Sequence, residues 1–233
     1  WSSFLVGAEC QKAQRAAIDA QPVSRSQIFL AGTVDTQSCG SYTECRAATL
    51  AGAADQMSYL GPEPLDMLML DYPSSSGCDG INGQWVALTK LYSAKQVKAV
   101  AVSNFAAEQL SCLLSSTQSP TLPVANQMRF SVGHTDVDLQ LNAEHGIVVQ
   151  AYSPLGSGSL LHDKLLRSIG AAHGSKTAAQ VALRYVLQKN VTIATQSTSL
   201  EHLAEDVDIF GWSLTAKEMD ALDAYSNAVE AEM

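Results

Sequence analysis

The chain has few basic residues and no long apolar run, and each of these absences excludes a class of protein. Fourteen Lys and Arg stand against twenty-three Asp and Glu among the 233 residues, which gives a formal net charge of −9. This balance argues against binding to the phosphate backbone of nucleic acids. The longest apolar stretch, residues 147–155, is the length of a strand rather than of a membrane span. We therefore expect neither a nucleic-acid partner nor a transmembrane helix.

The cysteines also lack the spacing of a metal or redox motif. None of the five forms a Cys-x-x-Cys pair or lies with histidines at zinc-ligand spacing, and we expect no metal site. Cys39 and Cys45 are close enough in sequence for a disulfide within a loop, but the favoured interpretation is reduced thiols that pack as small apolar groups. The compartment stays open. Because the chain begins at Trp1 rather than Met, one expectation is an organelle reached after removal of a targeting segment.

What the chain does contain is a regular alternation of apolar runs and helical patterns. Apolar residues make up 46% of the chain and charged residues 16%, which predicts a large buried core. Six short apolar runs predict strands at 28–34, 65–70, 97–103, 124–128, 147–152 and 191–195. Helical patterns follow at 8–20, 42–60, 84–92, 106–115, 136–144, 164–172, 177–188 and 215–225. This order predicts βαβ units and an α/β fold with a parallel sheet.

Five segments resemble the aldo-keto reductase family. They read VKAVAVSNF at 97–105, VANQ at 124–127, HGIVVQAYSPLG at 145–156, TAAQVALR at 177–184 and STSLEHLAE at 197–205. Their order and spacing extend the resemblance over roughly the whole chain. It implies one (β/α)8 TIM-type barrel domain over residues 1–233 that binds NADPH and reduces carbonyls. Six recognisable strands instead of eight predict a barrel that is N-terminally truncated or incomplete, with an open edge that other protein subunits would cover.

The resemblance also marks four catalytic positions, and none keeps the family residue. Asp71, before Tyr72, stands where the family has a histidine, and Thr33 stands where it has a lysine. Counting back from residues 17–18 places Ser3 and Ala8 at the aspartate and tyrosine positions. A charged carboxylate at position 71 cannot donate a hydrogen bond to a carbonyl and would repel the developing oxyanion. We therefore expect all four catalytic positions to be degenerate.

The cofactor positions are better preserved at one end than at the other. Ser103, Asn104 and Gln127 stand where the family binds the nicotinamide carboxamide, and Tyr152 where it stacks the ring. At the adenosine phosphate end, Gln196 replaces a lysine and His202 an arginine, so two cations that would pair with phosphate are missing. We expect the four retained residues to be vestigial.

Two hypotheses for the function follow. The favoured one is an aldo-keto reductase-like pseudoenzyme without a cofactor, which serves as a structural or interaction subunit, peripheral to a larger assembly such as a membrane complex. The alternative is a divergent NADPH-dependent carbonyl reductase in which Asp71 or Tyr72 acts as the acid. A hydrolase is excluded because no Gly-x-Ser-x-Gly elbow is present. Residues 134–138, a candidate set of metal ligands, are better explained as the start of a solvated helix.

Overall fold

The computed structural model of the chain describes residues 7–117 and 119–231. Its strands pair in chain order and run parallel, which confirms the predicted α/β fold class with six strands. They are β1 (Ala31–Val34), β2 (Met67–Leu70), β3 (Val100–Ser103), β4 (Ala125–Arg129), β5 (Val148–Tyr152) and β6 (Thr192–Ile193). Each lies at one of the predicted apolar runs, and most are shorter than predicted at the amino end.

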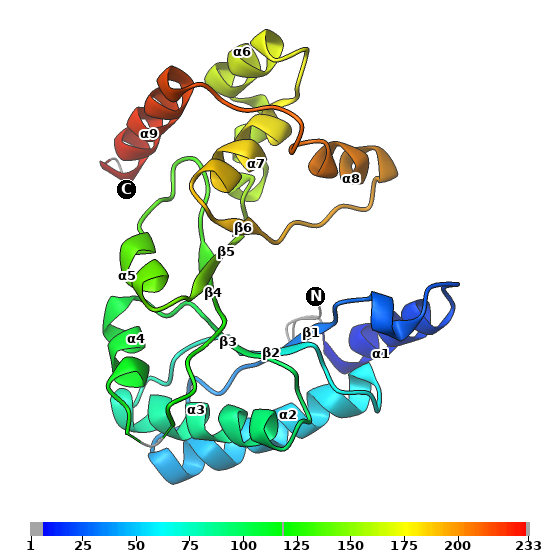
Figure 1. Cartoon of the computed structure of the whole chain (residues 1–233), viewed down its shortest axis with the longest axis vertical. Helices are drawn as coiled ribbons and strands as arrows, with labels where there is room; N and C mark the ends of the chain where they lie inside the picture. Colours follow the sequence, from blue (N-terminus) through cyan, green and yellow to red (C-terminus); the bar gives the residue numbers. More distant parts are fainter. Residues whose placement is uncertain (1–6, 118, 232–233) are drawn as a thin grey trace. The chain divides into compact units, whose positions relative to one another are not determined.

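Helices follow the strands along the chain (Figure 1). The α-helices are α1 (Gly7–Asp19), α2 (Tyr42–Leu60), α3 (Cys78–Ser93), α4 (Ala107–Leu114), α5 (Leu139–Glu144), α6 (Lys164–Ala172), α7 (Ala178–Gln188), α8 (Leu200–Val207) and α9 (Ala216–Ala231). Two short 3-10 helices are η2 (Arg25–Gln27) and η3 (Gly156–His162). Helix α3 begins six residues before the predicted start at 84 and includes glycines at 80 and 83. No helix within the described ranges is long and apolar enough to cross a membrane.

The chain divides into two compact units. The first comprises residues 1–126 and 140–147, and the second comprises residues 127–139 and 148–233. The expectation of a single barrel domain over residues 1–233 stays a prediction.

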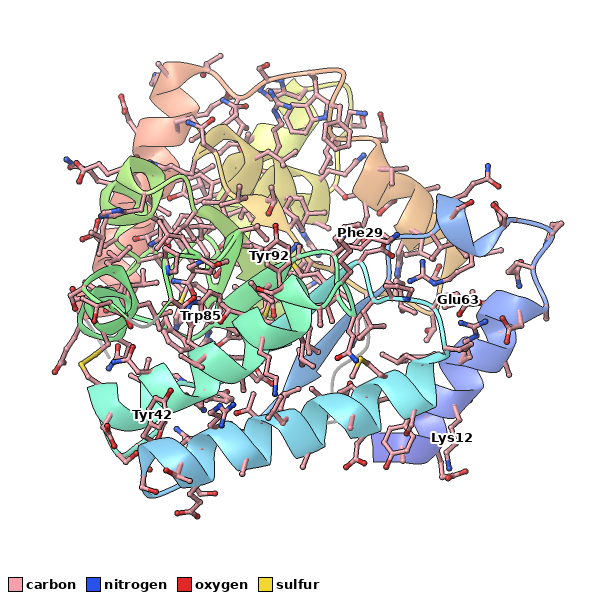
Figure 2. All side chains as sticks on the ribbon, turned by 60° about the horizontal axis from the view of Figure 1, so that its bottom comes forward. Lys12, Phe29, Tyr42, Glu63, Trp85 and Tyr92 are labelled. Carbon is pink, nitrogen blue, oxygen red and sulfur yellow. A yellow bond between two sulfur atoms is a disulfide. The ribbon has the colours of Figure 1, made fainter. Side chains whose placement is uncertain are left out.

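The first unit buries both faces of β1, β2 and β3. Alternate residues on one face form a cluster of small and flexible side chains, made of Ala31, Met67, Met69, Ala99, Ala101 and Ala125. The opposite face contributes to a larger cluster with residues of α2, α3 and α4. Helices α2 and α3 pack alongside one another (Figure 1). Trp85 of α3, labelled in Figure 2, is 1% exposed and donates its indole N–H to the Thr121 carbonyl at 2.8 Å. Burial on two faces explains why these strands read as continuous apolar runs.

Helix α1 is fixed to α2 by polar contacts rather than by a broad apolar stripe. The buried side-chain amides of Gln11 and Gln56 bond each other reciprocally, at 2.7 and 3.2 Å. Arg15 donates to the Leu60 carbonyl at 3.1 Å and pairs with Glu63 at 2.6 Å. These contacts hold the first helix of the described chain against the end of α2.

Four of the five cysteines form disulfides, so the expectation of reduced thiols is wrong for them. Cys39 bonds Cys45, with 5.0 Å between their Cα atoms, and Cys78 bonds Cys112, with 5.2 Å. Cys10 is a free and exposed thiol. The first bridge lies within one loop and helix start, as its spacing allowed. The second joins α3 to α4 across 34 residues, which spacing alone could not indicate.

The second unit has its own core, in which α6 and α7 pack with β5. The most buried members include Val149, Ala151, Leu166, Val181 and Tyr185. The helices of this unit are capped by side chains: Thr177 and Gln180 form a capping box at α7. Before α9, the Glu218 carboxylate accepts the Thr215 backbone N–H at 2.7 Å. The unit therefore has its own helix caps and apolar core.

Candidate active site

Asp71 lies at the carboxyl end of β2, in line with polar residues of the two neighbouring strands. Val34 pairs with Leu70, and Leu70 pairs with Val102. The residue after each of these three is Asp35, Asp71 and Ser103, so the register sets those residues side by side at one edge of the sheet. The Asp71 backbone N–H donates to the Val34 carbonyl at 2.9 Å, which continues the pairing to the edge. Carboxyl ends of parallel strands are where α/β folds place their chemistry.

The environment of Asp71 favours its neutral form. Its residue surface is only 9% exposed. Burial and, to a lesser extent, the negative charge of Asp35 raise the pKa of the Asp71 carboxyl from 3.8 to about 6, although a hydrogen bond from the Ser103 hydroxyl opposes the change. At pH 7 about a tenth of the molecules therefore carry a protonated Asp71, and at pH 5 about nine-tenths. Asp71 is therefore mostly a carboxylate at pH 7 and mostly a carboxylic acid at pH 5, and the expected degeneracy of this catalytic position stays a prediction.

The loops after β1 and β2 are held together by hydrogen bonds. The Ser75 backbone N–H donates to the Gln37 carbonyl at 2.8 Å, and the Ser74 hydroxyl donates to the Cys39 carbonyl at 3.2 Å. The fully buried Gln84 of α3 accepts the Ser74 backbone N–H at 2.9 Å and donates to the Thr36 hydroxyl at 2.9 Å. Sequence analysis did not single out Gln84. These bonds fix the two loops that carry Asp35 and Asp71.

Asn104 leaves β3 in a conformation that directs its amide back toward Asp71. Its φ is 61°, in the left-handed region that asparagine tolerates better than most residues. The side-chain amide donates to the Asp71 carbonyl at 2.9 Å and to the Ser103 hydroxyl at 3.1 Å. The structure thus brings Asp71, Ser103 and Asn104 together in the first unit.

The other three catalytic positions supply no ionisable group. Thr33 lies in β1 and is 1% exposed, two residues before Asp35 and on the same side of the strand. Ala8 lies at the start of α1 and is half-buried. Ser3 lies outside the described residues. Among the described residues at the four catalytic positions, Asp71 is therefore the one with a titratable side chain.

The second unit carries the remaining cofactor positions. Gln127 in β4 is buried, and its side-chain N–H donates to the side-chain Oε1 of Gln150 at 2.7 Å. Tyr152 ends β5 and is half-buried. Gln196 and His202 are both exposed, and the Ser199 hydroxyl, which caps α8, accepts the His202 backbone N–H at 3.3 Å. Positions 196 and 202 offer no fixed positive charge.

Metal-assisted chemistry has no ready ligand set in the described part of the chain. Among those residues, no three or more His, Cys, Asp or Glu are grouped so as to hold a metal ion.

Comparison with known proteins decides the family. The model of the aldo/keto reductase family matches residues 8–227. The chain belongs to the aldo/keto reductase family. An aldo-keto reductase of Mycolicibacterium smegmatis is 32% identical over 208 residues, which are 89% of this chain and 70% of that protein. The glyoxal reductase of Bacillus subtilis is 32% identical over 203 residues, 87% of this chain and 70% of the enzyme. A solved aldo/keto reductase from Brucella melitensis superposes with a TM-score of 0.84 at 27% identity, covering 96% of this chain and 82% of that one.

These relatives correct two predictions. The favoured hypothesis, a non-catalytic subunit, is contradicted because the chain matches proteins named as reductases over most of its length. The expectation of no cofactor is contradicted for the same reason, since membership of this family implies use of NAD(P)H. The error was to give four substituted side chains more weight than the similarity of the rest of the chain to reductases. The expected partner subunits and the vestigial nature of the cofactor residues stay predictions.

Proposed function

We propose that this protein is a divergent NAD(P)H-dependent carbonyl reductase in which Asp71 is the general acid. The observation that supports the proposal most strongly is a buried carboxyl with a pKa raised to about 6 at the carboxyl end of β2. It occupies the position where the family has a catalytic histidine. The similarity to a glyoxal reductase supports small aldehydes, glyoxal among them, as the substrate class.

Asp71 would act in its protonated form. When bound, NAD(P)H supplies a hydride to the carbonyl carbon. The Asp71 carboxylic acid donates a hydrogen bond to the carbonyl oxygen and transfers its proton as negative charge develops there. The carboxylate that remains is stabilised by the Ser103 hydroxyl, which already donates to it. Reduction therefore becomes faster as the pH falls toward 6, and at neutral pH most of the enzyme carries the wrong protonation state and turns over slowly.

Asp71 is a better acid than Tyr72, the other candidate. Tyr72 is 36% exposed, whereas Asp71 is buried and positioned by both neighbouring strands. The Asp71 backbone is also held by the Asn104 side-chain amide, which donates to the Asp71 carbonyl at 2.9 Å.

The residues that would hold the cofactor are those whose polar groups lie at strand ends. In the first unit, Ser103 and Asn104 would bind the nicotinamide carboxamide. Because Gln196 and His202 lack a fixed positive charge, the extra phosphate of NADPH gains no strong ion pair there. We expect NADH and NADPH to serve with KM values within about threefold of each other.

Steady-state assays of the purified chain test this function. We expect glyoxal-dependent oxidation of NADH or NADPH, measured by loss of nicotinamide absorbance between about pH 5 and about pH 8. Asp71→Asn should lower kcat/KM by about 100-fold or more, while Asp55→Asn, on the exposed side of α2, should leave it unchanged. Absence of carbonyl-dependent oxidation with either nucleotide, together with no rise in Tm at millimolar nucleotide, would refute the proposal.

A further inference from the structure

Asp35 lies beside Asp71, at the end of the neighbouring strand β1. It follows β1 as Asp71 follows β2, and the pairing of Val34 with Leu70 puts the two residues on adjacent strands at the same level. Neighbouring strands lie about 4.8 Å apart, and residues paired in parallel register point to the same face. Thr33 and Met69, also paired and two residues earlier, point to that face as well. The two carboxyl groups therefore face the same space at the edge of the sheet.

The position of Asp35 is fixed by its own loop. Its carboxylate accepts the Gln37 backbone N–H at 2.9 Å, a turn bond between residues two apart. Gln37 in turn accepts two hydrogen bonds from Ser75 in the Asp71 loop, from the backbone N–H at 2.8 Å and from the hydroxyl at 3.0 Å. Asp35 and Asp71 are thus held on two loops that cannot move apart without breaking these bonds.

The two residues differ in their exposure to water. Asp35 is exposed, whereas Asp71 is buried. Water solvates the exposed carboxylate, while the buried carboxyl can relieve the repulsion between the two groups by taking up a proton. A like charge on the neighbouring strand, about 4.8 Å away between backbones, favours protonation of the buried Asp71 even when water partly screens it.

Several charged groups of the first unit are engaged elsewhere. Glu44 of α2 accepts the Gly40 backbone N–H at 3.0 Å, and Asp79 of α3 accepts that of Tyr42 at 3.0 Å. The β3 side presents the uncharged Ser103 and Asn104. The cations Arg25 and Lys98 pair with Asp66, at the opposite end of β2. Asp35 is the negative charge that raises the pKa of Asp71.

We propose that Asp35 is a positioning residue for the reductase: its carboxylate, held on the neighbouring strand end on the same side of the sheet as Asp71, favours the acid form of the Asp71 carboxyl by repulsion. The proposal rests on the proposed function in one respect: the proton on Asp71 is the one used in carbonyl reduction. The negative charge of Asp35 is one of the two causes that raise the pKa of Asp71, the larger being burial. Nothing in the family resemblance had pointed to Asp35, because no family motif covers it.

The test is a titration of Asp71 that does not depend on activity. The carboxyl carbon resonances of labelled aspartate are followed against pH in the wild type and in Asp35→Asn, and the Asp71 signal is assigned by its loss in Asp71→Asn. The asparagine keeps the size of Asp35 and the acceptor for the Gln37 N–H, and removes only the charge. We expect the Asp71 midpoint to fall by about half a pH unit or more in Asp35→Asn. The matched control Asp55→Asn, with the same change in net charge, should not move it.

Asp35→Asn also changes the pH dependence of activity if the proposed function holds. The pH at which kcat/KM for reduction begins to fall should move down by the same amount as the Asp71 midpoint. An Asp71 midpoint that is identical in Asp35→Asn and wild type overturns the role of Asp35, whatever the activity. If the Asp71 midpoint shifts in Asp35→Asn but the wild type reduces no carbonyl, the interaction between Asp35 and Asp71 is supported and the proposed function is refuted.

A second measurement uses the unaltered protein and removes any dependence on how well the variant folds. Salt shortens the Debye length from about 30 Å at 0.01 M to about 3 Å at 1 M and so screens an exposed charge such as Asp35. In the wild type, the pH of the Asp71 midpoint should be lower at about 1 M salt than at about 0.01 M salt. A midpoint that does not change with salt would overturn the proposal.

Discussion

Two aspartates at opposite ends of the same strand show how position sets the chemistry of a carboxyl group. Asp66 precedes β2 and Asp71 follows it, roughly 16 Å apart along an extended chain. Asp66 accepts the Leu30 N–H at 2.8 Å and pairs with Arg25 at 2.8 Å and Lys98 at 2.7 Å. Asp71 has a carboxylate and a hydroxyl as neighbours instead.

The pKa values of the two carboxyl groups diverge accordingly. For Asp66, burial is outweighed by the Leu30 N–H, Lys98 and Arg25, and the pKa falls to about 2. For Asp71, burial is reinforced by Asp35, and the pKa rises to about 6. The comparison teaches that burial alone does not decide the charge of an aspartate. Donors at the amino end of the strand make one aspartate a structural anion, and their scarcity at the carboxyl end leaves the other able to carry a proton.

The largest effect is expected at the structural end. Asp66→Asn should destabilise the fold by about 3 kcal/mol at pH 7, because it leaves the half-buried Arg25 without its counter-charge. Because the folded pKa of Asp66 is depressed, the stability it contributes is present above its ordinary pKa and is lost as the pH falls toward 2. Urea unfolding at several pH values should show the difference from wild type shrinking on acidification. The Asp55→Asn control should change stability by no more than about 0.5 kcal/mol.

The opposite sign is expected at the other end of the strand. The folded pKa of Asp71 is raised, so the folded state binds more protons than the unfolded state between the ordinary pKa of 3.8 and about 6, and stability falls as the pH rises through this window. Asp71→Asn removes that loss and should be more stable than wild type by about 2 kcal/mol at about pH 8. Chemical denaturation at that pH checks the prediction. A variant less stable than wild type there would remove the contrast between Asp66 and Asp71.

A smaller effect is expected from the Ser103 hydroxyl, which opposes the rise in the pKa of Asp71. The Ser103 hydrogen bond lowers the pKa of Asp71, so Ser103→Ala should raise that pKa further, by about half a unit. The acid form would then persist to higher pH in an aspartate titration. Ser111→Ala, at an exposed position on α4, is the matched control and should leave the titration unchanged. A fall in the Asp71 pKa in Ser103→Ala would show that the hydroxyl does not stabilise the carboxylate.

The sequence predicted the strands and located Asp71, but not the environment that changes its chemistry. Strands buried on both faces leave a clear apolar signal, and Asp71 stands directly after one of them. Asp35 stands directly after another, and that shared position was a signal available without any family motif. Gln84 could not be foreseen, because its role depends on where α3 brings it relative to the β1 and β2 loops. Cys78 and Cys112 likewise meet only once α3 and α4 have packed.

The central claim, that Asp71 supplies the proton for carbonyl reduction, is tested most directly by the pH dependence of kcat/KM in the wild type and in Asp71→Asn. The account predicts a wild-type rate that is constant below about pH 6 and falls roughly tenfold for each pH unit above it. It predicts a low and flat profile for Asp71→Asn. If both proteins show the same rate and the same dependence on pH, Asp71 is not the acid and the account is contradicted.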